Sequence, residues 1–117
     1  MLFRSRVAEL AYGEMITEKL PQDDLIGDLV RDQLIYYPTV TRDPFRNRGR
    51  ITDLMTSGKL FSDVGLAPLA SEHDRVMICG SPALVHDTRA LLSAKGFVEG
   101  NHGEPGHFVV EKAFAER

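Results

Sequence analysis

The fold is decided by Asp74-Arg75-Val76-Met77-Ile78-Cys79-Gly80-Ser81-Pro82 and the segment after it, Ala83-Leu84-Val85-His86-Asp87-Thr88-Arg89-Ala90-Leu91-Leu92. An apolar run that stops at a glycine and gives way to a proline and a helical pattern predicts a strand, a tight turn and a helix. Gly80 allows close backbone approach, Ser81 suits the helix N-cap and Pro82 suits the first helical turn. In α/β sheets such a junction is where ligands bind, although a buried strand with its connecting helix and no ligand has the same pattern.

Composition restricts the class of protein. The chain has 117 residues, 43% hydrophobic and 26% charged, which is typical of one small globular domain or part of a larger one. The net charge of -3 argues against nucleic-acid binding. No apolar run approaches the roughly 18 residues of a membrane span, and no signal segment opens the chain, so we expect no membrane association. The single cysteine, Cys79, fits a cytoplasmic location.

Periodicity on either side of the central stretch completes an α/β pattern. Amphipathic helices are expected over residues 6–20, ended by Pro21, and over 23–34. The helix expected over 23–34 should bury its apolar face, which is made of Leu25, Ile26, Leu29, Val30 and Leu34. Residues 34–41 and 107–111 favour strands, and a short helix that begins near Ile51 should end at Gly58. The apolar start, Met1-Leu2-Phe3, is typical of the tail of a strand whose beginning is missing.

Positive charge is concentrated directly after the strand predicted over 34–41. Arg42, Arg46, Arg48 and Arg50 lie within nine residues that contain one acid, Asp43. Guanidinium groups bind phosphate through a rigid fork, and the Thr41 hydroxyl adds a donor beside them. The alternative is a solvated loop whose arginines pair with surface acids. Position favours an anion site, because this loop and the turn after Ile78 should open at the same edge of a parallel sheet.

The glycine- and proline-rich loop 101–107 contains His102, Glu104 and His107. Their spacing matches no motif for metal ligation, and no cysteine is nearby to add a ligand. We therefore expect a connecting loop and no metal site.

Four segments in order together resemble the bacterial ferredoxin(flavodoxin)–NADP reductases, over nearly the whole chain. They are Tyr36-Tyr37-Pro38-Thr39-Val40-Thr41-Arg42, Gly49-Arg50-Ile51-Thr52-Asp53-Leu54, Val76-Met77-Ile78-Cys79-Gly80-Ser81-Pro82 and His102-Gly103-Glu104-Pro105-Gly106-His107-Phe108-Val109-Val110-Glu111-Lys112-Ala113-Phe114. The resemblance implies a Rossmann-like parallel sheet with flanking helices. It also implies an oxidoreductase that passes hydride from NADPH to FAD and then electrons to ferredoxin or flavodoxin.

The resemblance also assigns roles to residues. In that family the positions of Thr41, Arg42 and Arg50 hold the adenosine 2′-phosphate of NADP. The turn formed by Cys79 and Gly80 lies beside the nicotinamide, where a small thiol leaves room for the ring to reach the flavin.

Two further assignments complete the set implied for the cofactors. Ser81, which follows that turn, is also expected to bind the cofactor. The terminal extension that begins at Ala113 and Phe114 covers the flavin ring in the bacterial subclass.

The chain departs from the family pattern, because the FAD-binding barrel and the first strand of the NADP-binding domain are absent. Residues 1–117 are therefore expected to be the C-terminal part of that domain, inactive in isolation, and whether the chain is itself an enzyme stays open. A sheet that lacks a strand exposes an apolar edge, so we expect the chain either to form a homodimer through that edge or to be marginally folded. The alternative function is a non-catalytic module that binds a phosphorylated nucleotide or a protein.

Overall fold

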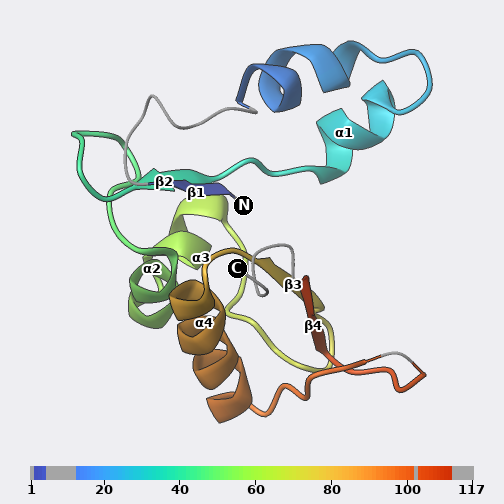
Figure 1. Ribbon diagram of the computed structural model, residues 1–117. Coiled ribbons are helices and arrows are strands. Elements are labelled where there is room, and N and C mark those ends of the chain that lie inside the picture. Colours follow the sequence, from blue (N-terminus) through green and yellow to red (C-terminus); the bar gives the residue numbers. More distant parts are fainter. Residues whose placement is uncertain (1, 5–12, 102, 112–117) are drawn as a thin grey trace. The chain divides into compact units, whose positions relative to one another are not determined.

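The computed structural model describes residues 2–4, 13–101 and 103–111 (Figure 1). It divides into two compact units, Met1–Leu66 and Ala67–Arg117, each of which is described by itself. Each unit combines helices with one pair of parallel strands, so the predicted α/β class is confirmed. Predictions that fall on residues 5–12, 102 and 112–117 lie outside the described part of the chain.

The first unit is built on a parallel pair made of β1 (Leu2–Arg4) and β2 (Pro38–Val40). In its register Leu2 lies opposite Pro38 and Arg4 opposite Val40. All of β2 is buried, and Thr39 and Val40 are 0% exposed. Pro38 begins the strand, where a missing N–H is tolerated. The prediction that the chain dimerises through the edge of this sheet stays a prediction.

The helical segment of the first unit is less regular than predicted. Residues 13–22 are helical and include the π-helix η2 (Met15–Lys19) and the 3₁₀-helix η3 (Leu20–Gln22). The expectation that Pro21 ends this segment is wrong, because Pro21 occupies the first turn of η3, where its missing N–H costs no hydrogen bond.

The next helix, α1 (Gly27–Gln33), is shorter than the predicted 23–34. Residues before it are held in a turn, because the Asp23 carboxylate accepts hydrogen bonds from Leu25 N at 2.8 Å and Ile26 N at 3.0 Å. The bonds from Ile26 and Leu25 lower the pKa of Asp23. Leu25 is 91% exposed and Leu29 58%, Ile26 and Leu34 are also exposed, and Val30 is half-buried. The predicted burial of this apolar face is therefore wrong.

Two helices follow β2 and supply much of the core of the first unit. They are α2 (Ile51–Ser57) and α3 (Lys59–Val64), joined by Gly58, whose φ of +83° is a left-handed conformation that favours glycine. Leu54, Leu60 and Phe61 are buried. The predicted end of α2 at Gly58 is confirmed.

A side-chain network joins the start of β2 to α3. The buried Tyr37 donates its hydroxyl proton to Asp63 Oδ2 at 2.6 Å, and Lys59 Nζ also bonds that carboxylate. Burial and the hydrogen bond to Asp63 raise the pKa of Tyr37 to about 12. The hydrogen bonds from Lys59 and Tyr37 lower the pKa of Asp63.

The Tyr37 hydroxyl predicts an alkaline stability limit. Because its pKa in the fold is above the ordinary tyrosine value of 10.0, its stabilising contribution is present below about pH 10 and is lost as the pH rises toward about 12. Phenolate absorbance should show one tyrosine ionising late, coincident with falling stability. In Tyr37→Phe that late step should disappear, whereas Tyr36→Phe should retain it. A late step that survives in Tyr37→Phe would contradict this assignment.

The second unit contains the strand, turn and helix that the central stretch predicted. They are β3 (Val76–Cys79), paired in parallel with β4 (Phe108–Glu111), and α4 (Pro82–Ala94). Its core consists of Ile78, Thr88, Leu92, Phe97 and Phe108. None of the helices in the part of the chain that the structure describes has the length and apolar character needed to cross a membrane.

The chain leading into β4 is held by close contact between two glycines. A Cβ on Gly106 would lie 2.3 Å from Gly100 N and 2.6 Å from Val98 O, which are backbone atoms and not the ends of flexible side chains. His107 holds the same segment in place through two contacts. Its Nδ1 accepts a hydrogen bond from Val98 N at 2.9 Å, and its ring packs edge-on against Phe97. This histidine therefore has a structural role.

Gly106→Ala should lower the free energy of unfolding by about 2 kcal/mol or more, because the methyl group would force the two backbones apart. The matched control is Gly103→Ala, where nothing lies within 4 Å and only the φ of +92° opposes the substitution. That control should cost about 1 kcal/mol. Urea unfolding followed by circular dichroism measures both variants, and equal losses would argue against the close contact.

Candidate functional site

Residues 41–50, which we call the arginine loop, leave the end of β2 and return to it. Gly49 N donates to Val40 O at 2.8 Å, and Val40 N donates to Asn47 O at 3.1 Å. The buried Asn47 side chain adds a third tether, because its Nδ2 donates to Pro38 O at 3.0 Å. The loop thus continues directly from the buried strand at residue 41 and is bonded back to it at Asn47 and Gly49.

The arginine loop presents its cations to solvent. Arg42, Arg46, Arg48 and Arg50 are all exposed. Within the described residues no carboxylate forms an ion pair with any of the four. The alternative interpretation, in which surface acids neutralise these arginines, therefore finds no support in the described part of this unit. Exposed cations gathered on one short loop attract anions.

Individual positions in the arginine loop differ in their surroundings. Thr41 is half-buried beside the exposed Arg42. The Arg46 guanidinium lies over the Phe45 ring, 4.8 Å from its centroid, in a cation–π contact. Arg50 is the N-cap residue of α2, in an extended conformation.

The turn after β3 has the local structure that its sequence predicted. Ser81 caps α4, since its Oγ accepts a hydrogen bond from Leu84 N at 3.3 Å, and Pro82 follows in the first turn. A Cβ on Gly80 would lie 2.6 Å from Leu84 Cδ2, so the Leu84 side chain would have to shift to admit any larger residue. Cys79 is exposed. The sulfur is thus accessible at the carboxyl end of its strand.

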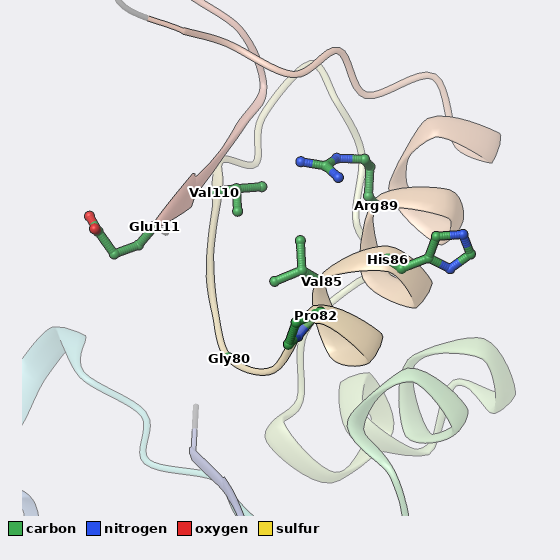
Figure 2. A pocket seen from close by; sticks show the side chains of 7 residues that line it. All are labelled: Gly80, Pro82, Val85, His86, Arg89, Val110 and Glu111. Carbon is green, nitrogen blue, oxygen red and sulfur yellow. The ribbon is translucent and has the colours of Figure 1, made fainter. Parts of the chain in front are cut away.

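A pocket of about 300 Å³ lies where this turn meets β4 (Figure 2). Figure 2 shows Val85 and Val110 pointing toward each other, with the Arg89 guanidinium reaching over the space between them. The pocket is lined by Gly80, Pro82, Val85, His86, Arg89, Val110 and Glu111. It has an apolar floor and charged groups at its rim, as small-molecule sites commonly do.

Three charged residues of this region were not singled out from the sequence. Glu111 lies opposite Cys79 in the register of the parallel pair, which places a carboxylate beside the thiol-bearing end of β3. Arg89 is held by Glu99 through two hydrogen bonds, at 2.6 Å and 3.3 Å. The first contact depends on strand register and the second on the folding back of residues 98–100. A local pattern of residues predicts neither of these features.

Two further sequence predictions involve residues that the structure does not describe. Among the described residues no group of potential metal ligands occurs, but His102 of the loop 101–107 lies outside them, so the expected absence of a metal site stays a prediction. Ala113 and Phe114, expected to cover a flavin, lie outside the described residues. The prediction that the arginine loop and the Cys79–Gly80 turn open at one edge of one sheet stays a prediction, because the two units are described separately.

Parallel strands followed by helices, with a pocket at the carboxyl end of a strand, define an α/β domain of the Rossmann-like class. A solved structure supports this class: a ferredoxin NADP+ reductase from Neisseria gonorrhoeae with bound FAD and NADP matches with a TM-score of 0.73. The match covers 93% of this chain and 41% of that chain, at 23% sequence identity, and it establishes the fold. No protein-family model matches the chain.

Sequence relatives match this chain over part of their own length. The chain is 53% identical over 112 residues to the ferredoxin–NADP reductase of Pseudomonas aeruginosa, which covers 95% of the chain and 43% of that protein. It is 53% identical over 108 residues to the flavodoxin/ferredoxin–NADP reductase of Rhodobacter capsulatus, covering 92% of the chain and 40% of the relative. The chain is therefore homologous to a C-terminal portion of the bacterial ferredoxin–NADP reductases, as the sequence predicted. It spans less than half the length of these relatives.

Loss of the cap at the turn after β3 should be measurable. Ser81→Ala should lower the free energy of unfolding by about 1 kcal/mol, because the N–H of Leu84 loses its acceptor. Ser81→Asp should keep most of the stability, since a carboxylate caps the helix and suits the positive end of its dipole. Thermal unfolding measures both variants. Equal loss in the two would mean that the hydroxyl stabilises the turn in another way.

Proposed function

We propose that this chain is the NADP(H)-binding portion of a flavin-dependent ferredoxin or flavodoxin–NADP reductase. When completed by a flavin-binding region, the enzyme would move hydride between NADPH and FAD and pass electrons to ferredoxin or flavodoxin. The relatives are ferredoxin or flavodoxin–NADP reductases, which supports the reaction, and the solved neighbour was crystallised with FAD and NADP, which supports the cofactor pair. Residues 1–117 would form part of the NADP-binding domain and would be inactive without the rest.

The arginine loop is the observation that carries this proposal. In it Arg42 and Arg50 would bind the adenosine 2′-phosphate, with the Thr41 hydroxyl as an additional donor. A phosphomonoester fits these residues chemically, because two guanidinium forks supply charge-assisted hydrogen bonds to its oxygens. The tethering of the loop to β2 supports the fit, since donors that are already ordered lose less conformational entropy when they bind.

The turn after β3 would serve the other end of the dinucleotide. Cys79 and Gly80 would lie beside the nicotinamide, and Ser81 would hold the turn by capping α4. The small exposed thiol and the glycine leave space for a planar ring, and the adjoining pocket offers an apolar floor. When bound, the nicotinamide supplies the hydride chemistry. The chain's own residues would orient the ring and keep one of its faces free.

The same proposal extends to the end of the chain. Ala113 and Phe114 would cover the flavin ring in the complete enzyme, as the family resemblance implies.

NADP and NAD titrations against the isolated chain test the proposal. The chain should bind NADP more tightly than NAD, because only NADP carries the 2′-phosphate. Arg42→Ala and Arg50→Ala should each weaken NADP binding about tenfold or more, which corresponds to about 1.4 kcal/mol or more for a lost charge-assisted contact. Neither substitution should change NAD binding appreciably. Calorimetry provides both dissociation constants.

Lys19→Ala is the matched control, because it removes an exposed positive charge of the same unit outside the arginine loop. It should leave the NADP preference unchanged. Equal binding of NADP and NAD, or binding of neither, would contradict the proposal and favour the alternative of a non-catalytic module that binds another phosphorylated nucleotide or a protein.

A further inference from the structure

An apolar surface on the first unit is not used by the proposed nucleotide site. Ten large apolar side chains are exposed in the part of the chain that the structure describes, and six of them belong to residues 15–35. We call these six the apolar helical surface: Met15, Leu25, Ile26, Leu29, Leu34 and Ile35. Single exposed apolar residues are ordinary, whereas a group of them marks an interaction site.

The elements that carry this surface pack on one another. The short helix η3 contacts both η2 and α1, so one helical segment carries most of the exposed apolar residues (Figure 1). A pocket of about 260 Å³ opens in the same segment. Its lining includes Ile16, Pro21, Val30, Leu34 and Tyr36. The volume is small for a cofactor or substrate site and suits an inserted side chain.

The Tyr36 side chain indicates that a neighbour is missing at this place. Its hydroxyl oxygen is buried and has no hydrogen-bond partner among the described residues. Gly13 lies beside it, since a Cβ there would be 3.3 Å from the Tyr36 hydroxyl oxygen. Leaving a buried hydroxyl unpaired costs free energy, and native proteins contain few such groups. An unpaired hydroxyl on a residue that lines the pocket therefore points to a further protein segment that packs here.

The charge of this segment restricts what the surface binds. Residues 13–35 contain six acids and two bases, Lys19 and Arg31, so their net charge is -4. Arg31 is already engaged, because its guanidinium bonds Asp28 and the carbonyl oxygen of Pro21. An anionic membrane or a nucleic acid would be repelled by the excess of acids. The surface therefore fits a protein segment with an apolar centre and a neutral or basic rim.

The longer relatives indicate where such a segment comes from. This chain covers 43% of the Pseudomonas aeruginosa reductase and corresponds to a C-terminal portion, so the rest of that protein lies mainly before the matching portion. The preceding polypeptide would join the first unit at β1, and the same unit carries the apolar helical surface. In α/β domains helices connect successive parallel strands, and helices on one face of the sheet pack side by side.

From these observations we infer that the apolar helical surface is an interface within the complete reductase, where it packs against the polypeptide that precedes the matching portion in the relatives. An apolar side chain of that polypeptide fills the pocket beside Tyr36. The inference rests on the proposed function, in which this chain is one part of a longer enzyme, but it does not depend on the arginine loop. It follows that ferredoxin or flavodoxin docks elsewhere, because this surface is already covered.

Alkylation of introduced thiols measures whether the surface is covered. Leu25→Cys and Leu29→Cys each place a thiol on it, and they are made in the 117-residue chain and in a full-length chimera. In the chimera the chain replaces the matching portion of the P. aeruginosa reductase, to which it is 53% identical. Peptide mapping by mass spectrometry separates each new thiol from Cys79. Both thiols should react with iodoacetamide about tenfold or more slowly in the chimera, because a covered thiol reacts only when its cover opens locally.

Leu66→Cys is the matched control, since Leu66 is a leucine of the same unit that is as exposed as Leu29 but lies outside the apolar helical surface. Its thiol should react at the same rate in the chain and in the chimera. Unfolding of the chimera by Leu25→Cys but not by Leu66→Cys, followed by circular dichroism, would also support a covered position.

Two results would overturn the inference. Equal rates in the chain and in the chimera at positions 25 and 29 would show that the preceding polypeptide leaves the surface free for another protein. Slow alkylation of the isolated chain that speeds up on dilution would show that a second copy of the chain covers it. A chimera that protects both thiols but does not prefer NADP over NAD would contradict the proposed nucleotide site alone.

Discussion

The tethering of the arginine loop to β2 is the constraint on which the functional interpretation depends. Val40 is 0% exposed, and its N–H and C=O are bonded to Asn47 and Gly49 respectively. Leaving a buried backbone N–H or C=O without a hydrogen-bond partner costs free energy. These two bonds therefore constrain the backbone of the loop as well as that of the strand. The buried side chain of Asn47, bonded to Pro38 O, makes the same connection from the loop. The exposed arginines are thereby attached to an ordered backbone.

Stability and function are assigned to different residues in this chain. Asn47, Gly106 and the Tyr37–Asp63 pair hold backbone segments together, and in our account they do not contact a ligand. The four arginines of the loop are exposed and make no ion pair with a described carboxylate, so the fold does not depend on them in the way that it depends on buried groups. Substitutions in the arginine loop can therefore report on binding without unfolding the chain, which is what the titrations require.

Much of the fold and part of the site could be predicted from sequence, because the signals are local. The run before Gly80, the cap at Ser81 and the proline at 82 specify β3 and α4 without reference to distant residues. The arginine cluster is likewise contiguous. Prediction failed where a side chain overrode periodicity, as when the Asp23 carboxylate held residues 24–26 out of the helix and left Leu25 exposed. It also missed Glu111 beside Cys79, because strand register is a long-range property.

The central claim, that the arginine loop binds the 2′-phosphate, is tested most directly by two-dimensional NMR of the labelled chain with saturating NADP or NAD. The difference between the two spectra isolates the effect of the single additional phosphate. We predict that this difference is concentrated in the backbone amides of residues 41–50 and in the Nε–H signals of Arg42 and Arg50. A difference spectrum that leaves those signals unmoved, or one centred on other residues, would contradict the account.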